Sequence, residues 1–139
     1  FIMVMNELKK LGLRLTPQRM AILKILEGNT THPATEEIFN QLRPQYPSLS
    51  IATVYNTLEV LVKAGKLQEI RITSDKRHFD PNPVPHSHFL CRKCDAIFDL
   101  DTGSSGIEIP YNMEGHLVED CAHYYYGICR NCRDESEDK

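Results

Sequence analysis

The chain of 139 residues is 41% hydrophobic and 25% charged, a composition typical of one or two folded domains that excludes a largely disordered protein. No apolar run approaches the roughly 18 residues of a membrane span, and the first residues lack the basic stretch and cleavage site of a signal peptide, so we expect a cytoplasmic protein without a membrane partner. The net charge of −3 excludes a uniformly basic nucleic-acid binder, but residues 1–80 carry 11 Lys and Arg against 8 Asp and Glu, whereas residues 81–139 carry 5 against 11. This difference in sign fits a first half that faces nucleic acid and a second half with another task.

Three short helices are predicted in the first half of the chain. The first begins at Thr16 and Pro17, where threonine can cap the helix and proline suits its first position, and it stops near Gly28. The second covers TEEIFNQLR. The third, residues 51–64, is capped by Ser50 and has helical spacing of apolar residues. Its predicted buried face consists of Ile51, Val54, Leu58, Leu61 and Val62.

A strand pair and a linker complete the predicted organisation. The stretch LQEIRITSDKRHFD alternates like two strands around a Ser-Asp turn, which predicts a winged-helix domain over residues 1–80. The following PNPVP, residues 81–85, can continue neither a helix nor a central strand and predicts a semi-rigid linker. In residues 86–139 we expect strands at HFLC, AIFDL and HYYYGIC, and a frayed, charged end at RDESEDK. The predicted class is α+β.

All five cysteines lie in the second half, and four of them form two C-x-x-C pairs. These four, Cys91, Cys94, Cys129 and Cys132, offer the thiolates of a closed tetrahedral zinc site. A thiol-disulfide pair or unrelated buried cysteines are the alternatives, but disulfides are rare in a reducing cytosol. Cys121 has no such partner and is expected to be a small buried apolar residue.

Two histidines precede the first cysteine pair. His86 and His88 are two residues apart, so on a strand they project from the same face. A tight turn through Arg92 and Lys93 would place His86 opposite Asp99 on the returning strand. Two imidazoles and a carboxylate suit iron(II), manganese(II) or zinc, which predicts a second metal site; solvated polar side chains are the alternative.

Six motifs of the chain resemble the ferric uptake regulator (Fur) superfamily in their order and spacing. They are RLTPQR at 14–19, THPATEEIF at 31–39, PSLSIATVYNTLEVL at 47–61, RHFD at 77–80, HSHFLCRKC at 86–94 and GICRNC at 127–132. The resemblance implies a homodimeric, metal-dependent transcriptional repressor that binds double-stranded operator DNA and is not an enzyme. It also implies an N-terminal winged-helix domain and a small C-terminal α/β dimerisation domain, residues 86–139, with structural zinc.

Within the superfamily the chain is most similar to the peroxide-sensing (PerR) branch, which has aspartate at position 99 where iron-uptake members have glutamate. The resemblance implies a regulatory Fe(II) or Mn(II) ion bound by His32, Asp80, His86, His88 and Asp99. It further implies that peroxide oxidises His32 or His86 in the iron form and that DNA is then released. A repressor that senses iron or zinc availability (Fur- or Zur-like) is the alternative. A further site of some relatives is not expected, because its positions are Pro85, Ser87 and Cys121 here.

Several side chains are candidates for DNA contacts, because the N-terminal end of the helix 51–64 would enter the major groove. They are Arg14, Arg19, Ser50, Thr53, Tyr55 and Asn56. Two other functions use the same residues: two histidines and a carboxylate also form the iron site of oxygenases, and C-x-x-C pairs serve thiol redox chemistry. The segment 102–115 is short and rich in glycine where the family resemblance would place a helix, which bears on the dimer contacts.

Overall fold

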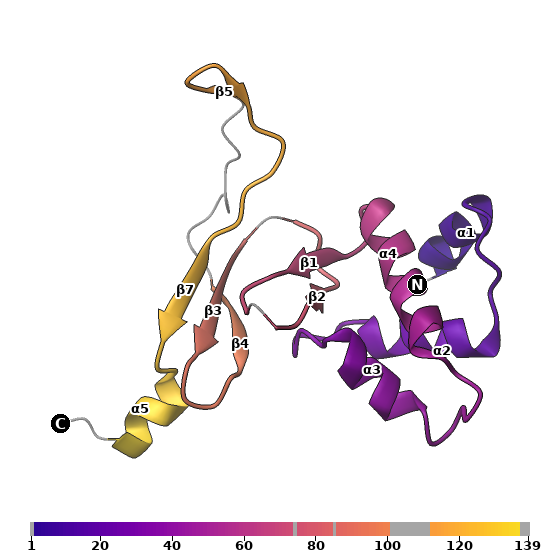
Figure 1. Cartoon of the computed structure of the whole chain (residues 1–139), viewed down its shortest axis with the longest axis horizontal. Helices are drawn as coiled ribbons and strands as arrows, with labels where there is room; N and C mark the ends of the chain where they lie inside the picture. The colour runs from indigo at the N-terminus through magenta and orange to yellow at the C-terminus, as the bar shows by residue number, and fades with distance from the viewer. Residues whose placement is uncertain (1, 74, 85, 101–111, 137–139) are drawn as a thin grey trace. The chain divides into compact units, whose positions relative to one another are not determined.

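The computed structural model describes residues 2–73, 75–84, 86–100 and 112–136. The chain forms two compact units, Phe1–Pro83 and Val84–Lys139, and the division falls within the proline-rich stretch 81–85 (Figure 1). Helices and small sheets are both present, which confirms the α+β class. Across the described ranges, none of the helices has the length and apolar character that crossing a membrane requires.

The first unit is a set of helices followed by a two-stranded sheet. Its elements are α1 (Ile2–Lys10), α2 (Pro17–Leu26), α3 (Thr35–Leu42), α4 (Ile51–Lys63), β1 (Gln68–Ile70) and β2 (His78–Asp80). The strands β1 and β2 pair antiparallel, with Glu69 opposite Phe79. The three predicted helices and the strand pair of the winged helix are confirmed, whereas α1 was not predicted. We call residues 68–80 the wing.

Capping side chains fix where two of the helices begin. Thr16 Oγ1 accepts a hydrogen bond from the backbone N–H of Arg19 at 3.2 Å, and Pro17 occupies the first turn of α2. Ser50 Oγ accepts from the backbone N–H of Thr53 at 3.1 Å at the start of α4. Both caps satisfy N–H groups that have no partner inside the helix, so the local sequence alone determines these two starts.

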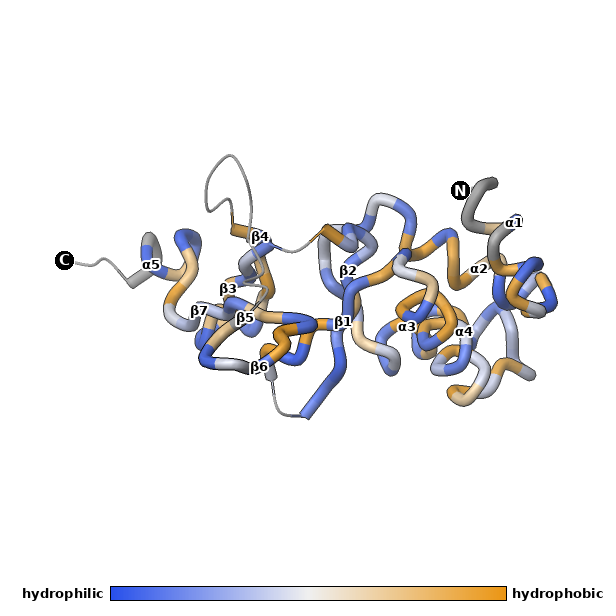
Figure 2. Tube along the Cα trace, turned by 90° about the horizontal axis from the view of Figure 1, so that it is seen from above, coloured by the Kyte–Doolittle hydropathy of each residue, from blue (hydrophilic) through white to orange (hydrophobic). Residues whose placement is uncertain are grey.

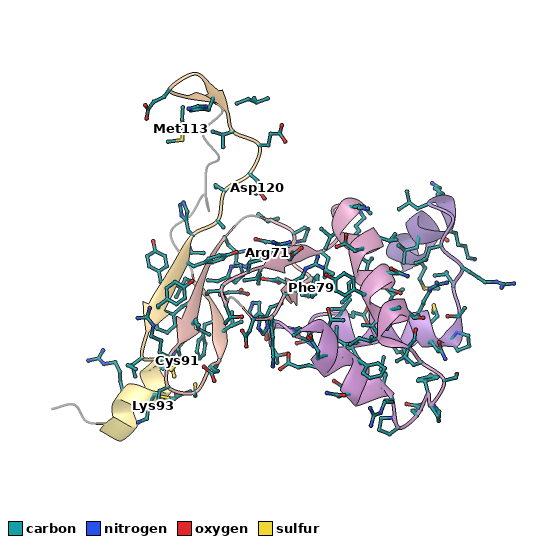
Figure 3. All side chains as sticks on the ribbon, in the orientation of Figure 1. Arg71, Phe79, Cys91, Lys93, Met113 and Asp120 are labelled. Carbon is teal, nitrogen blue, oxygen red and sulfur yellow. The ribbon has the colours of Figure 1, made fainter. Side chains whose placement is uncertain are left out.

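Apolar residues from all four helices and from the wing form the core of the first unit. Its fully buried members include Leu8, Ile22, Ile38, Val54, Leu58 and Phe79. Figure 2 shows hydrophobic segments alternating with hydrophilic ones along α3 and α4, as expected of helices with one buried face, and Figure 3 labels Phe79 in β2. The prediction that Ile51 belongs to the buried face is wrong: Ile51 is the first residue of α4 and is 45% exposed, and its neighbours Ser50 and Ala52 are exposed as well.

The second unit contains a three-stranded sheet, a short hairpin and a terminal helix. Its elements are β3 (Ser87–Cys91), β4 (Ile97–Leu100), β5 (Asn112–Met113), β6 (His116–Leu117), β7 (Tyr124–Gly127) and α5 (Arg130–Ser136). The sheet has the order β4-β3-β7, with β3 antiparallel to β4 and parallel to β7. The three predicted strands are therefore confirmed. The parallel pair brings the end of β7 beside the end of β3, and each of these ends carries a cysteine pair.

The predicted register of the first hairpin is wrong by two residues. His88, not His86, lies opposite Asp99. The turn between β3 and β4 is longer than a two-residue turn, because Cys91 and Ala96 form its closing backbone bond and Asp95 adopts a positive φ of 64°. A shift of two residues preserves the side-chain alternation, so both histidines still share a face with Asp99.

The end of the chain also differs from its prediction. Arg130–Ser136 form α5, although the charged sequence RDESEDK predicted a frayed end from Arg133; the last part of that stretch, 137–139, lies outside the described residues. Most of the segment 102–115, which bears on the dimer contacts, lies outside the described residues. Its last part enters the β5–β6 hairpin, whose turn at Glu114 and Gly115 has positive φ angles of 51° and 86°. Met113, labelled in Figure 3, is 52% exposed on this hairpin.

Candidate metal centres

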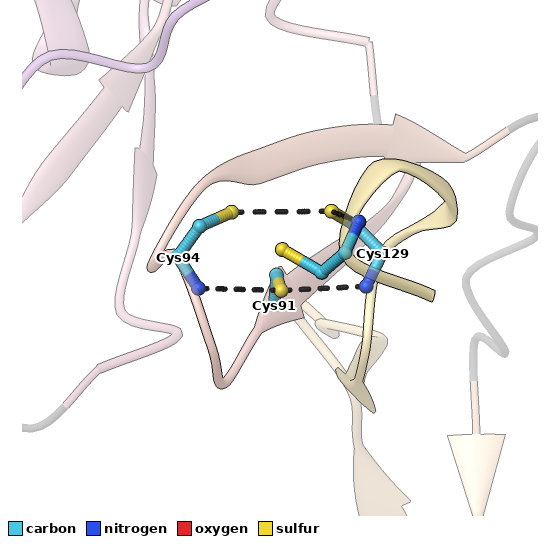
Figure 4. Close-up of side chains that lie close together, drawn as sticks. Cys91, Cys94 and Cys129 are labelled. Atoms are coloured by element: carbon cyan, nitrogen blue, oxygen red, sulfur yellow. Dashed lines mark hydrogen bonds between the residues drawn. The ribbon is translucent and has the colours of Figure 1, made fainter. Parts of the chain in front are cut away.

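Four thiols from the two C-x-x-C pairs converge at one end of the second unit. All four sulfur atoms lie within 4.8 Å of one another, and the Sγ atoms of Cys94 and Cys129 are 3.9 Å apart (Figure 4). Tetrahedral zinc with Zn–S bonds of about 2.3 Å places its sulfurs about 3.8 Å apart. The spacing of these thiols therefore fits zinc, and we call Cys91, Cys94, Cys129 and Cys132 the thiol cluster.

Backbone N–H groups around the cluster stabilise one sulfur, that of Cys91, in the thiolate form that binds a cation. Cys91 Sγ accepts from the backbone nitrogens of Lys93 and Cys94 at 3.4 Å each and from that of Cys129 at 3.3 Å. Burial raises the pKa of the Cys91 thiol, but these donors stabilise the thiolate and together lower the pKa to about 6. Figure 4 shows the donors from Cys94 and Cys129 on either side of this sulfur.

The other thiols resist ionisation in the absence of a cation. The pKa of Cys132 is raised to about 12, because its thiol shares a hydrogen bond with the Cys129 sulfur and is buried. For Cys94 the backbone N–H of Ala96 lowers the pKa, but the neighbouring Cys91 sulfur and burial outweigh it and the pKa is raised. Several thiolates this close repel one another, so a divalent cation is needed for all of them to ionise together. Cys121 is half-buried and does not belong to the cluster.

A histidine and a carboxylate form a buried pair in the first unit. His32 Nε2 lies 3.3 Å from Asp80 Oδ2, and their side chains are 1% and 3% exposed. The other carboxylate oxygen of Asp80 accepts from the backbone N–H of Asn82 at 2.9 Å, which fixes the direction of the carboxylate. Two adjacent ligands on bonds of about 2.1 Å lie about 3.0 to 3.4 Å apart, so this pair, the first half-site, has the spacing of metal ligands.

Strand β2 holds the backbone of the first half-site. His32 has a positive φ of 56°, a conformation that is uncommon for any residue except glycine. The His78 ring donates from Nδ1 to the His32 carbonyl at 2.8 Å, and the backbone N–H of Phe79 donates to the carbonyl of Pro33 at 3.0 Å. His78 thus supports the backbone from which the His32 side chain projects, and sequence reasoning missed it although it lies in the quoted motif RHFD.

Two histidines meet one carboxylate oxygen in the second unit. Asp99 Oδ1 lies 2.9 Å from His86 Nε2 and 3.3 Å from His88 Nε2, and the two imidazole rings are 4.3 Å apart between centroids. His88 is buried, whereas Asp99 is exposed. We call these three residues the second half-site. The expected convergence of both imidazoles on Asp99 is thus present despite the shifted register.

The tautomer of His86 indicates what belongs between it and Asp99. His86 Nδ1 lies 2.6 Å from the carbonyl oxygen of Val84 and must donate to it, because a carbonyl can only accept. In a neutral imidazole the lone pair of Nε2 then faces a carboxylate oxygen, and two acceptors in contact repel each other. A proton or a metal cation between them removes this repulsion, so the donor set fits a metal.

The candidate DNA-contacting residues lie at the N-terminal ends of α2 and α4. Arg14, Ser50, Tyr55 and Asn56 are exposed, whereas Arg19 and Thr53 are half-buried. Arg19 Nη1 donates to the Arg14 carbonyl at 2.7 Å, and Ser50 and Thr53 also pair through their hydroxyl groups at 3.0 Å. Part of their hydrogen-bonding capacity therefore stabilises the helix ends, while Tyr55 and Asn56 remain accessible.

Comparison with known proteins defines the class to which this fold and these metal centres belong. A sequence model of the ferric uptake regulator family matches residues 10–109. The chain therefore belongs to the ferric uptake regulator family, which consists of metal-dependent transcriptional regulators.

Individual relatives come from several bacteria. The chain is 36% identical over 132 residues to the peroxide-responsive repressor PerR of Staphylococcus aureus strain Mu50, an alignment that covers 92% of this chain and 88% of that protein. The solved ferric uptake regulator of Francisella tularensis with iron is 28% identical, with a TM-score of 0.67 over 88% of this chain and 96% of that one. The peroxide stress regulator of Campylobacter jejuni is 31% identical, with a TM-score of 0.61 over 92% and 98%.

Proposed function

We propose that this protein is a homodimeric repressor that binds operator DNA with a regulatory metal and releases it when peroxide oxidises the iron-loaded site. The observation that carries the proposal is the contact of two imidazole nitrogens with one aspartate oxygen in the second half-site, at 2.9 and 3.3 Å. The peroxide-responsive repressor of S. aureus, at 36% identity, supports the choice of signal.

One regulatory ion bound by both half-sites would link the two units. The first half-site offers two ligands and the second offers three, and together they are the five side chains that the family resemblance implies for one Fe(II) or Mn(II) ion. Binding of one ion by all five side chains would favour a single orientation of the units. Reversing a two-state equilibrium from 1:99 to 99:1 takes about 5.5 kcal/mol of differential binding, which a five-ligand site formed in one state can supply.

The orientation of the units matters for DNA because a dimer presents two α4 helices. The two recognition helices of a dimer must match the spacing between the two halves of a palindromic operator. A metal-dependent angle between the units would thus control operator affinity. The thiol cluster cannot do this, because all four of its residues belong to the second unit; we assign it a structural zinc ion.

Bound iron(II) with an open coordination position would supply the chemistry that reduces peroxide to a strong local oxidant. The side chains closest to such a site are its own ligands, and by resemblance to the peroxide-sensing branch we expect His32 or His86 to gain an oxygen atom. An oxidised imidazole is a poorer ligand. Loss of either side chain from the ligand set would uncouple the two units and lower operator affinity.

Peptide mass spectrometry tests this proposal. The protein is loaded with Fe(II) or with Mn(II), treated with peroxide, and digested. We expect one added oxygen atom on the peptide of His32 or His86 in the Fe(II) form and none in the Mn(II) form. Oxidation of the thiol cluster with both histidines intact would instead show that the cysteines are the sensor.

Repression in response to iron availability is the second candidate, because the iron-bound regulator of F. tularensis has a TM-score of 0.67 to this chain. The two candidates differ in how DNA binding depends on metal and peroxide. A peroxide sensor binds operator DNA with either Fe(II) or Mn(II) and loses it to peroxide only in the Fe(II) form. An iron-availability sensor requires Fe(II) for binding and is insensitive to brief peroxide treatment.

A further inference from the structure

A group of charged side chains lies between helix α4 and the wing. The guanidinium group of Arg77, in the wing, donates from Nη2 to Glu59 Oε1 of α4 at 2.7 Å. It also forms a two-point contact with Glu69 of β1, from Nη2 to Oε1 at 2.6 Å and from Nε to Oε2 at 2.8 Å. A planar fork of this kind fixes direction as well as distance. Arg77 therefore joins the predicted recognition helix to the wing through two carboxylates.

The same guanidinium group lies over an aromatic ring of the recognition helix. Its central carbon is 4.7 Å from the centroid of the Tyr55 ring, a cation–π distance, and 5.6 Å from that of Phe79, which belongs to the core. Tyr55 is 41% exposed, so one part of its ring packs on Arg77 while the rest is accessible. The ring also lines a cavity of about 330 Å³ whose other walls come from the wing.

The balance of charge argues against Arg77 itself as a contact for DNA phosphate. Two carboxylates oppose its single positive charge, and its side chain is only 23% exposed. Arg71 also pairs with Glu69, but its side chain is 70% exposed. The two arginines, Arg71 and Arg77, and the two glutamates, Glu59 and Glu69, together carry no net charge. Their arrangement therefore stabilises a geometry more than it attracts a polyanion.

We propose that Arg77 is a positioning residue for sequence recognition: it holds the Tyr55 ring and the wing in the orientation in which α4 reads base edges. The inference rests on the proposed DNA-binding function. The proposed role of Arg77 concerns the sequence specificity of DNA binding and not the general affinity for DNA. Loss of the Arg77 fork frees the Tyr55 side chain and the wing, and ordering them again on binding costs affinity only for the duplex that requires that orientation.

Three variants separate this role from a simple charge effect. Arg77→Lys keeps the positive charge but cannot form the two-point fork. Glu59→Gln removes a negative charge, which by electrostatics alone would strengthen DNA binding, yet it also weakens one anchor of Arg77, because an amide oxygen accepts without the charge of a carboxylate. Arg71→Gln is the control, because it deletes a positive charge that pairs with the same Glu69 but keeps the Arg77 guanidinium group that lies over the Tyr55 ring.

The measurement compares the affinities of the Mn(II)-loaded protein for two duplexes. One is selected from a randomised pool by the wild-type protein, and the other is a scrambled duplex of the same length. We expect Arg77→Lys and Glu59→Gln each to weaken binding to the selected duplex by up to about tenfold, the cost of ordering one freed side chain again, with scrambled binding unchanged or stronger. Arg71→Gln should weaken both duplexes by a similar factor.

A readout without DNA tests the geometry directly. The ring resonances of Tyr55 in the NMR spectrum should shift in Arg77→Lys and Glu59→Gln by clearly more than in Arg71→Gln, with zinc content and thermal unfolding as checks of the fold. Unshifted resonances, or a wild-type ratio of the two affinities in Arg77→Lys, would overturn the positioning role. If the wild-type protein itself selects no duplex, the proposed function fails, while the Tyr55 resonances still decide whether Arg77 holds the ring.

Discussion

Replacing Cys132 by serine is expected to unfold the second unit while leaving the first unit folded. Apart from cysteines, the buried apolar side chains of the second unit are Leu90 and Ile97 within the residues described. Burial of two such side chains contributes about 3 to 6 kcal/mol. Zinc in a four-thiolate site contributes about 10 to 16 kcal/mol at neutral pH, so the metal dominates the stability of this unit.

The first unit does not depend on the thiol cluster. Its core is formed by residues of α1 to α4 and the wing, and none of the four cysteines contributes to it. The Cys132→Ser variant should therefore show two separable behaviours. Backbone amides of β3 and β7 lose their protection from hydrogen exchange, whereas those of α4 retain it.

The assay combines zinc analysis with hydrogen exchange, and Cys121→Ser is the matched control because Cys121 is half-buried outside the thiol cluster. Wild type and the control should each keep one zinc ion per chain after dialysis against a chelator, and Cys132→Ser should lose it. A Cys132→Ser protein that retains both zinc and wild-type protection in β3 would refute the reasoning. So would loss of protection in the control.

Three further outcomes are expected. Zinc must displace the proton of Cys132, whose pKa is about 12. The zinc affinity, measured against a competing chelator, should therefore rise about tenfold or more per pH unit near neutrality. Below about pH 6, the pKa of Cys91, zinc must displace a further proton and the pH dependence of the affinity should steepen. Asp99→Glu should keep Mn(II)-dependent DNA binding but slow the loss of the Fe(II)-loaded complex after peroxide, and an unchanged rate would show that this carboxylate does not set the sensitivity. His78→Phe removes the hydrogen bond to the His32 carbonyl, worth about 0.5 to 1.5 kcal/mol, so calorimetry should find Mn(II) affinity lowered up to about tenfold, with no change as the contrary result.

Local sequence was sufficient wherever an element depends on its own neighbours. The start of α4 follows from Ser50, whose hydroxyl caps the helix. The two C-x-x-C pairs identify the four thiols that lie together in the folded chain. The common face of His86 and His88 follows from the two-residue period of a strand. It survived an error of two residues in the predicted register, because the period is also two.

Tertiary structure decided the features that depend on contacts between distant segments. Helix α5 has a charged sequence, and it carries Cys132 of the thiol cluster, so a long-range cluster supports a segment that its own composition does not. His78 supports His32 across 46 residues of sequence, a separation over which no periodic pattern operates. Arg77 likewise meets Glu59 across 18 residues. Side-chain type and spacing specify what a residue can bind, but which partner it meets depends on the folded chain, because only folding brings separate segments within hydrogen-bonding distance.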